Sequence, residues 1–203
     1  MDKSLSVRLT LVSASPRRRE LLSKLGIPFD VCPSDAEELL TAADGCVLAI
    51  LNARRKVERS SFVEDRSRVL IGADTLIALD DRFLGKPDDL ASARNMLSLL
   101  SGRWHDVITG VHLSGPAAMM DAPFIHVESA VVTGVHFRPL SEQAVQAYLD
   151  TGEWEGKAGA YAIQGAGGDL VTEFNGDFDN VVGLPTNVIH DLLSTHYSHC
   201  NFL

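Results

Sequence analysis

The sequence predicts a mixed α/β fold, in which a central β-sheet is flanked by helices. Apolar β-type runs alternate along the chain with amphipathic helical segments, and no Pro-, Gly- or Ser-rich linker divides the 203 residues into independent parts. The length suits one large domain or a two-lobed one. With 45% hydrophobic and 22% charged residues, the chain can bury a sizeable core and is neither disordered nor fibrous.

The first strand and the first helix are joined by a serine-rich turn. Residues Arg8–Val12 predict a strand that ends at Ser13–Ser15. Ser15 can cap the following helix, and Pro16 occupies its first position, where the fixed backbone angle of proline is favourable. We expect this helix to extend to about Leu25, with Gly26 as its left-handed stop.

An exposed helix and a buried strand are expected next. The region from about Cys46 to Arg59 has apolar residues at mostly helical spacing and carries three basic side chains. The apolar run Val69–Ala73 then fits a buried strand that delivers Asp74 at its carboxyl end. Thr75–Leu79 continues the β pattern toward a turn at Asp80-Asp81.

The clearest amphipathic helix follows, and two long β-runs come after it. Asp88 or Asp89 can cap this helix, and Gly102 closes it. Its apolar positions lie at i, i+3, i+7 and i+10, namely Leu90, Ala93, Leu97 and Leu100. Trp104–Leu113 and Ile125–Phe137 alternate as β-runs joined by a loose Ser114–Pro123 segment, which indicates an antiparallel extension of the sheet.

The last third is expected to hold a capped helix, a glycine-rich loop, a strand pair and a closing helix. In order, these are Ser141–Leu149, Gly156–Gly168, Leu170–Phe174 with Asn180–Val182 around a turn at Asn175-Gly176, and about Thr186–Leu193. The tail of about 195–203 is expected to be loosely ordered.

Charge and targeting features exclude several classes of protein. The 18 basic and 27 acidic side chains give a net charge of −9, which disfavours broad binding of nucleic acids or anionic membranes. Residues 1–24 differ, with six basic and two acidic side chains. Three cysteines without Cys-x-x-Cys spacing disfavour a disulfide framework and a zinc site. Since no signal-like or membrane-spanning apolar run occurs, we expect a cytoplasmic protein.

The basic N-terminal segment predicts an anion site. Ser13 and Ser15 with Arg17–Arg19 stand where a strand meets a helix N-terminus, and free N–H groups and the helix dipole favour an anion there. Three arginines in the first helical turn oppose the dipole, which a bound phosphate would resolve. The alternative is a capped, solvated helix start with incidental basic residues.

Acidic residues form a second candidate group. Asp35, Glu37 and Glu38 follow Pro33, and carboxylates from separate elements can hold a hard divalent cation together with substrate phosphates. The Glu37-Glu38 pair could equally be a solvated acidic loop. Asp74 differs, because an apolar strand should partly desolvate it, as suits a general base.

Two further segments carry groups suited to a nucleotide. Lys86, in the turn Gly85-Lys86-Pro87, offers a flexible point charge for a polyphosphate, although an ordinary loop lysine is the alternative. In Lys157–Gly168 the glycines allow close approach to a ligand, and the Gln164 amide could read a base edge. This loop matches neither the dinucleotide-binding fingerprint nor the phosphate loop of kinases, and could be a tight connection.

Six strings, which span nearly the whole chain in one order, resemble the Maf family of nucleoside triphosphate pyrophosphatases. They are Ser-Ala-Ser-Pro-Arg-Arg (13–18), Gly-Ala-Asp-Thr (72–75), Gly-Lys-Pro (85–87), Leu-Ser-Gly-Arg (100–103), Lys-Ala-Gly-Ala-Tyr-Ala-Ile-Gln-Gly (157–165) and Asn-Val-Val-Gly-Leu-Pro (180–185). The resemblance implies a two-lobed fold around a cleft, related to inosine triphosphate pyrophosphatases, and commonly a homodimer. It also implies cleavage of a nucleoside triphosphate to a monophosphate and pyrophosphate with Mg²⁺ or Mn²⁺.

The resemblance also assigns roles to residues. It matches Asp74 to the proton acceptor and Glu38 to the acidic position near the metal, and it makes both carboxylates candidate metal ligands. Lys86 completes the catalytic candidates. The groups expected around the triphosphate are Ser13, Arg17, Lys56 and Lys86, with Arg18 from the same arginine run as a further substrate-binding candidate. Positions linked to substrate choice are Arg17, Thr75 and Gln164.

The fifth string contains Tyr-x-Ile-Gln-Gly, and this form resembles the sequence of the family branch that acts on dTTP and UTP. Two residues depart from the family pattern: Ala162 stands where glycine is usual, and Asp177 where a small polar residue is usual. The Lys56 region is only loosely family-like. The alternatives are a purine-directed pyrophosphatase acting on 7-methyl-GTP or ITP, and a nucleotide-binding regulator of septum formation without turnover.

Overall fold

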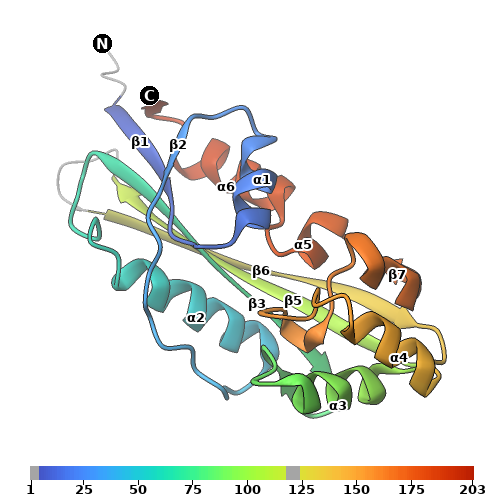
Figure 1. Ribbon diagram of the computed structural model, residues 1–203. Coiled ribbons are helices and arrows are strands. Elements are labelled where there is room, and N and C mark those ends of the chain that lie inside the picture. The colour runs from blue at the N-terminus through green and yellow to red at the C-terminus, as the bar shows by residue number, and fades with distance from the viewer. Residues whose placement is uncertain (1–4, 118–123) are drawn as a thin grey trace.

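A mixed β-sheet runs through the centre of the molecule and carries helices on both faces (Figure 1). The computed structural model describes residues 5–117 and 124–203. Its strands are β1 (Leu5–Leu11), β2 (Phe29–Val31), β3 (Arg68–Leu79), β4 (Arg82–Leu84), β5 (Trp104–Pro116), β6 (Phe124–Phe137), β7 (Val171–Asn175) and β8 (Cys200–Phe202). The order across the sheet is β2-β1-β3-β5-β6-β7, with β4 beside β3 and β8 beside β1.

Parallel and antiparallel pairing divide the sheet into two parts. Strand β1 runs parallel to β2, β3 and β8, whereas β3, β5, β6 and β7 form an antiparallel succession. The helices are α1 (Pro16–Ser23), α2 (Gly45–Glu58), α3 (Leu90–Leu100), α4 (Glu142–Leu149), α5 (Phe178–Val182) and α6 (Thr186–His196), with 3₁₀ turns η1 (Ala158–Ala160) and η2 (Gly165–Leu170). The predicted mixed sheet flanked by helices is confirmed.

Side chains at the helix N-termini fix where several helices begin. Ser15 Oγ accepts from the backbone N–H of Arg18, and Pro16 stands at the first helical position of α1, as the sequence predicted. Asp89 caps α3 through the N–H of Ser92, at 2.7 Å. Asp44 and Ser141 cap α2 and α4 in the same way. These caps are local, so the sequence reveals them without knowledge of the tertiary fold.

Helix α2 lies against one face of the sheet, on the opposite side from α1, α5 and α6 (Figure 1). The expectation of an exposed helix is therefore wrong, since α2 buries Leu48, Ala49, Ala53 and Val57. Glycines permit its close approach: a Cβ atom at Gly72 would come within 2.3 Å of the carbonyl oxygen of Ala53. Because this glycine lies on strand β3, the sequence pattern of the helix itself could not show that α2 packs against the sheet.

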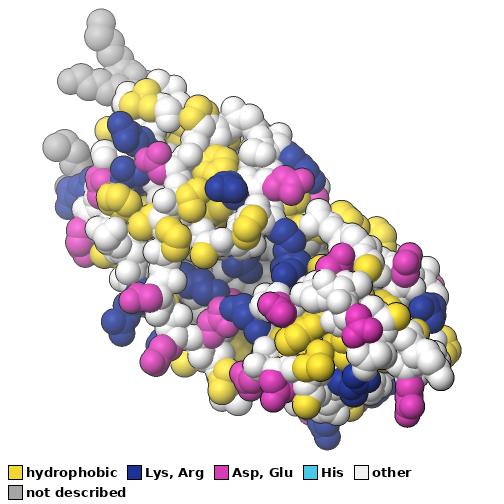
Figure 2. Space-filling model, in the orientation of Figure 1, with side chains coloured by type: hydrophobic (Ala, Val, Ile, Leu, Met, Phe, Trp, Pro, Cys, Tyr) yellow, Lys and Arg dark blue, Asp and Glu magenta, His cyan; other side chains and the backbone are white. Residues whose placement is uncertain are grey.

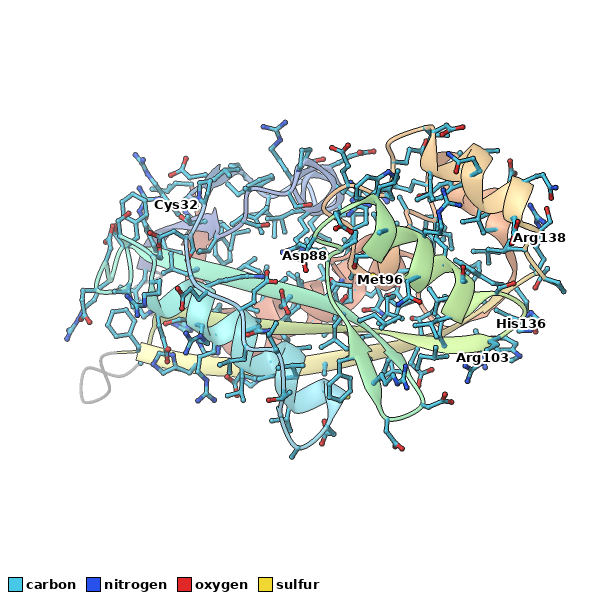
Figure 3. The ribbon with its side chains drawn as sticks, turned by 60° about the horizontal axis from the view of Figure 1, so that its bottom comes forward. Cys32, Asp88, Met96, Arg103, His136 and Arg138 are labelled. Atoms are coloured by element: carbon cyan, nitrogen blue, oxygen red, sulfur yellow. The ribbon has the colours of Figure 1, made fainter. Side chains whose placement is uncertain are left out.

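The opposite face of the sheet carries two large apolar clusters. One gathers Val69, Ile71 and Ala73 of β3 with side chains of α1 and α6, and the other gathers Ile77 and Leu79 with side chains of α3 and α4. In Figure 3, α3 with Met96 and α4 lie on the side of the sheet away from α2. Along β3, the residue that separates the two clusters on this face is Thr75.

Two predicted segments differ from the structure. Asn180–Val182 forms part of helix α5 rather than a strand. Asp177 begins this helix by accepting hydrogen bonds from the N–H groups of Asp179 and Asn180, and Gly183 ends it at a φ of 123°. The tail is also not loose: β8 pairs with β1, and Tyr197 is fully buried, donating its hydroxyl to the carbonyl of Ile125 at 2.8 Å. The first correction rests on local capping within residues 177–183, and the second on contacts between residues far apart in sequence.

The remaining expectations concern the β5–β6 connection, the cysteines and the membrane. The segment Ser114–Pro123 begins inside β5, and its residues 118–123 lie outside the described part. Cys32, Cys46 and Cys200 are free thiols. Among the described helices, none has the length and apolar character that a membrane crossing requires.

Candidate active site

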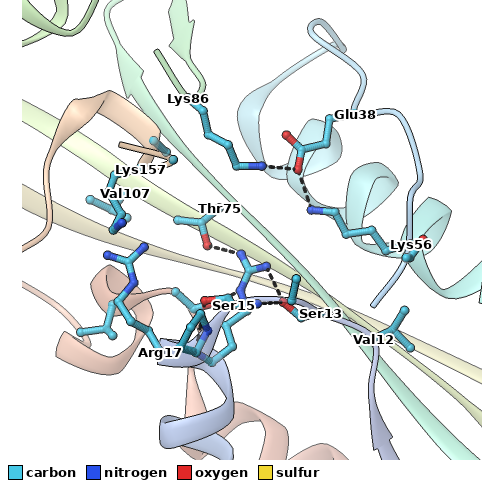
Figure 4. Close-up of a pocket in the computed structure, with 18 of the residues that line it drawn as sticks. Val12, Ser13, Ser15, Arg17, Glu38, Lys56, Thr75, Lys86, Val107 and Lys157 are labelled. Atoms are coloured by element: carbon cyan, nitrogen blue, oxygen red, sulfur yellow. Dashed lines mark hydrogen bonds and ion pairs between the residues drawn. The ribbon is translucent and has the colours of Figure 1, made fainter. Parts of the chain in front are cut away.

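The candidate site lies at a gap along one edge of β3. Strand β1 pairs with β3 as far as Ile71, and β4 begins its pairing at Ile77. Between these two residues, this edge of β3 has no partner strand in the described chain. The loop that follows β1 and the loop that follows β4 both contribute lining residues here, Ser13–Ser15 and Lys86 respectively. A cavity of about 700 Å³ occupies it (Figure 4).

The cavity brings together most of the candidate residues that the sequence indicated. Seven of the nine line it, namely Ser13, Arg17, Arg18, Glu38, Lys56, Thr75 and Lys86. Figure 2 shows basic side chains gathered around a hollow in this face of the molecule, with acidic side chains beside them. Asp74 and Gln164 do not line the cavity wall. Residues separated by up to 73 positions thus meet at one gap in the sheet.

Four charged side chains form what we call the paired wall: Glu38, Lys56 and Lys86, which line the cavity, and Asp74, which does not line it but contacts Lys56. Lys56 Nζ lies 2.8 Å from Glu38 Oε1 and 2.5 Å from Asp74 Oδ1. Lys86 Nζ lies 2.7 Å from the same Glu38 oxygen. Figure 4 shows Glu38 between the two ammonium groups. Each lysine of this wall therefore has a carboxylate partner, and the four formal charges sum to zero.

Asp74 is the buried member of the paired wall. Only 5% of its surface is exposed, and it lies in the middle of β3 rather than at the strand's end. Because side chains alternate along a strand, Asp74 faces α2 while Thr75 faces the opposite side. Asn52 of α2, itself 3% exposed, donates from Nδ2 to Asp74 Oδ2 at 3.1 Å. This bond fixes the carboxylate with Oδ1 toward Lys56 at the cavity.

Asn52 was missed by sequence reasoning, although a signal existed. It precedes Lys56 by four residues, so both side chains lie on one face of α2. A polar amide among the apolar residues on the inner face of a helix points to a buried partner. Asn52 also holds the preceding loop, because it accepts from Leu39 N at 2.7 Å and donates to Leu39 O at 3.1 Å. It thereby links the loop of Glu38 to Asp74.

The electrostatics of Glu38 follow from its two lysine neighbours. Burial alone would raise the pKa of Glu38, but Lys56 and Lys86 outweigh burial and lower the pKa from 4.5 to about 2. The carboxylate is therefore ionised at every pH at which the folded protein is ordinarily handled.

Three cations form the opposite side of the cavity, which we call the basic wall: Arg17, Arg18 and Lys157. The Arg18 guanidinium donates to Gly183 O (2.8 Å), Thr75 Oγ1 (3.0 Å) and Ser13 Oγ (3.4 Å). Lys157 donates to Glu155 O at 2.8 Å. Within residues 5–117 and 124–203, none of the three forms an ion pair with a carboxylate.

Burial and, to a smaller extent, repulsion disfavour the charges of two cations of the basic wall. Burial, followed by repulsion from Arg18, lowers the pKa of Arg17. Burial, followed by repulsion from Arg17, lowers the pKa of Lys157. A polyanion between these side chains would offset both pKa shifts, since it supplies opposite charge and hydrogen-bond acceptors.

The glycine-rich loop contributes different residues from those expected. Gln164 is partly buried at the start of η2 and lies outside the cavity lining, whereas Lys157, Ala158 and Tyr161 line it. Lys157 could have been singled out as the only cation in its loop. The resemblance names Arg17, Thr75 and Gln164 as positions linked to substrate choice, and in the structure the arginine that bonds Thr75 is Arg18.

The carboxylates of Glu38 and Asp74 suit a hard divalent cation. Both contact the Lys56 ammonium, so their oxygens already converge on one positive charge. Mg²⁺ and Mn²⁺ favour such oxygen donors, with the remaining positions filled by substrate phosphates and water. No group of three or more His, Cys, Asp or Glu side chains is placed to hold a metal ion in the described part of the chain. The donor set thus fits a cation that is shared with an anionic ligand.

Comparisons with known proteins agree over nearly the whole length. The family described as Maf-like protein matches residues 8–196. A protein named dTTP/UTP pyrophosphatase from Clostridioides difficile is 40% identical over 192 residues, which is 95% of this chain and 96% of that protein. One of the same name from Moorella thermoacetica is 43% identical, covering 92% of this chain and 94% of that protein.

One solved structure shows a weaker likeness. The HAM1 protein from Coxiella burnetii has 16% sequence identity and a TM-score of 0.38, over 64% of this chain and 73% of that chain. A similarity at this level carries no argument about the present fold or its activity.

Proposed function

The chain belongs to the Maf family, and from this premise we propose that it hydrolyses a nucleoside triphosphate to the monophosphate and pyrophosphate. The observation that carries the proposal is one cavity with five lysine and arginine side chains around it and a buried carboxylate, Asp74, at its edge. Five cations suit a triphosphate, and a fixed carboxylate suits the activation of water.

In this proposal the basic wall binds the anion first. Arg17, Arg18 and Lys157 bond only neutral groups or no group at all in the described structure, so no ion pair has to break when a triphosphate enters. Arg18 uses three of its five N–H donors on protein oxygens, which leaves two for the ligand. Ser13 and Ser15, at the N-terminus of α1, add hydroxyl and backbone donors.

The paired wall carries the chemical step. Asp74 Oδ1 accepts a proton from a water molecule while the water oxygen forms a bond to the α-phosphorus. The bond from this phosphorus to the α–β bridging oxygen breaks, and the electron pair leaves with pyrophosphate. Asn52 holds Asp74 Oδ2, so that Oδ1 stays directed toward the cavity. Lys56 and Lys86 stabilise the charge that develops on the leaving group.

A divalent cation accompanies the substrate in this scheme. Glu38 and Asp74 would hold it, and when bound it would neutralise phosphate oxygens and make the phosphorus more electrophilic. Lys56 lies between the two carboxylates, 2.8 Å from Glu38 and 2.5 Å from Asp74, so its ammonium moves from them to the phosphates on binding.

The proposed substrates are dTTP and UTP. The support is the shared name of the relatives, which match more than nine-tenths of this chain and of their own length. The proposed role is the clearance of excess or non-standard nucleotides in the cytoplasm. We further propose that the chain is a single two-lobed domain and that it forms a homodimer. Thr75 and Gln164, together with Arg17, are the residues to which we assign substrate choice.

A nucleotide panel tests the proposal. The purified protein is incubated with dTTP, UTP, CTP, ITP or 7-methyl-GTP in Mg²⁺ or Mn²⁺, and pyrophosphate release is measured. We expect the highest kcat/KM with dTTP and UTP. Preference for 7-methyl-GTP or ITP would overturn the substrate assignment, and the absence of turnover with every nucleotide would overturn the enzymatic function in favour of a binding role.

A further inference from the structure

A row of polar side chains, buried except for the half-buried Thr75, crosses the sheet between the two large apolar clusters. Thr75 of β3 stands directly opposite Thr109 of β5, and their hydroxyl oxygens are 2.9 Å apart. Thr109 is 0% exposed, as are Thr133 of β6 and Asn180 of α5. Only Thr75, at one end of the row, reaches the cavity. The row therefore connects the floor of the cavity to helix α5.

The directions of these hydrogen bonds follow from the number of hydrogen atoms. Thr109 Oγ1 donates its only hydrogen to the backbone carbonyl of Asn180, at 3.1 Å. The bond between the two threonines must then use the hydrogen of Thr75. Thr75 Oγ1 is left as an acceptor, which is what the Nη2 group of Arg18 requires at 3.0 Å. One arrangement of the hydroxyl groups is thus imposed from Asn180 to Arg18.

Helix α5 closes the row into a ring. Its end at Gly183 accepts from Arg18 Nε at 2.8 Å, so Arg18 is held from both sides by groups that α5 positions. Gly183 lies at a φ of 123°, a conformation that favours glycine. A Cβ atom there would lie 3.4 Å from Thr75 Oγ1 and 3.6 Å from Arg18 Nε. These are ordinary van der Waals distances, so it is the positive φ, and not a lack of space, that favours glycine beside Arg18.

Stability alone does not account for the polar row. Apolar side chains at these positions would join the two clusters, and replacing a buried polar pair by apolar groups of the same shape can be neutral or stabilising. The row also leaves Asn180 Oδ1 buried without a hydrogen-bond partner in the described structure, which is unfavourable by about 1–3 kcal/mol. What the row does provide is a fixed orientation for Thr75 and Arg18.

We propose that Thr109 is a positioning residue of the site, which acts through Thr75 to hold the guanidinium plane of Arg18 toward the ligand. Thr109 itself touches no ligand, because it is fully buried outside the cavity lining. The inference rests on the proposed function for its main readout. Its distinguishing property is that the effect of Thr109 passes through Thr75.

A double-mutant cycle with a conservative control tests the inference. Thr109→Val removes the hydroxyl at nearly constant volume, Thr109→Ser keeps it, and Thr75→Val removes the group through which Thr109 acts. We expect Thr109→Val to reduce kcat/KM on dTTP about tenfold and Thr109→Ser less than threefold. In the Thr75→Val background, Thr109→Val should change kcat/KM less than twofold. If Thr109→Val does not fold, Thr109→Ala takes its place.

The outcomes separate this inference from the proposed function. Equal losses in Thr109→Val and Thr109→Ser, or additive losses with Thr75→Val, would show a packing role and overturn it. If the wild type hydrolyses no nucleotide, the same cycle is measured as the Kd of a dTTP analogue with a methylene bridge between its α- and β-phosphorus atoms. The same non-additive pattern then supports the positioning role, and failure of the wild type to bind the analogue overturns both proposals.

Discussion

Both walls of the cavity carry lysine or arginine side chains, but only those of the paired wall form ion pairs with carboxylates in the described chain. On the paired wall, Lys56 and Lys86 are bound to Glu38, and Lys56 also contacts Asp74. On the basic wall, the hydrogen-bond partners of Arg18 and Lys157 are neutral oxygens. The three cations of that wall have no carboxylate partner in the described chain, and the pKa values of Arg17 and Lys157 are lowered by burial and by repulsion from a neighbouring arginine.

The difference indicates that the two walls contribute to different steps, substrate binding and turnover. A cation without an ion pair gains its full interaction when an anion arrives, whereas a paired lysine has to exchange one carboxylate for another anion. The basic wall should therefore dominate affinity for the triphosphate. The paired wall holds the Asp74 carboxylate in a neutral network, and under the proposed function it should dominate turnover.

The largest expected effect is on turnover, from the paired wall. Asp74→Asn keeps the size of the side chain but removes the proton acceptor, so we expect kcat for pyrophosphate release to fall by about 10²–10⁴-fold. The control is Asp106→Asn, which changes an exposed carboxylate on β5 outside the cavity lining. Steady-state kinetics and thermal melting measure both variants. An Asp74→Asn protein that folds and retains near-wild-type kcat would contradict the assignment.

The next effect is on affinity, from the basic wall. Arg17→Gln removes one unpaired cation, and loss of a charged hydrogen bond to phosphate should raise KM about 10–100-fold. Arg19→Gln is the matched control, because Arg19 occurs two residues later, is exposed and does not line the cavity. Equal KM values for the two variants would show that Arg17 does not contact the substrate.

A smaller effect is expected from a paired lysine. Lys86 is about half exposed and already bound to Glu38, so its interaction with the substrate replaces an existing one. We expect Lys86→Gln to reduce kcat/KM about 3–10-fold, less than Arg17→Gln. The ratio of the two losses measures the asymmetry of the walls directly, and a larger loss for Lys86→Gln would reverse the proposed division.

The smallest effect is a pH dependence of stability from Glu38. The folded-state pKa of about 2 lies below the ordinary 4.5, so the folded protein binds fewer protons here than the unfolded chain does. The stabilisation is complete above about pH 4.5 and is lost as the pH falls toward 2. Glu38→Gln should therefore be less stable than the wild type by at most about 1 kcal/mol at pH 6.

Urea unfolding at several pH values measures this difference. The gap between Glu38→Gln and the wild type should narrow below about pH 4.5, with the exposed neighbour Glu37→Gln as the control. A gap that stays constant from pH 6 to pH 3 would show that the lysines do not stabilise the Glu38 carboxylate.

Local signals in the sequence predicted much of the fold. Ser15 and Pro16 marked the start of α1, and Asp89 and Gly102 enclosed α3, because capping depends on a few adjacent residues. The burial of α2 and the pairing of the tail could not be predicted in the same way. Both depend on which distant strand the segment meets, and neither Gly72 nor Tyr197 reveals its neighbour.

The candidate site divides along the same line. The residue types predicted that basic side chains such as Arg17 and Lys86 bind an anion, and that carboxylates such as Asp74 bind a divalent cation together with it. The gap in the edge of β3 could not be predicted, because it arises where two strands from different parts of the chain end. Because the sequence does not reveal the gap, it predicted Asp74 at the end of a strand. For the same reason it predicted neither the contact of Asn52 with Asp74 nor the hydrogen bond from Arg18 to Thr75.

The measurement that tests the central claim most directly is ³¹P NMR of dTTP hydrolysed by the wild-type protein with Mg²⁺. The account predicts signals of dTMP and pyrophosphate in equal amounts and no dTDP, because the bond between the α-phosphorus and its bridging oxygen is the one that breaks. Formation of dTDP and inorganic phosphate, or an unchanged dTTP spectrum while UTP is also left intact, would contradict it.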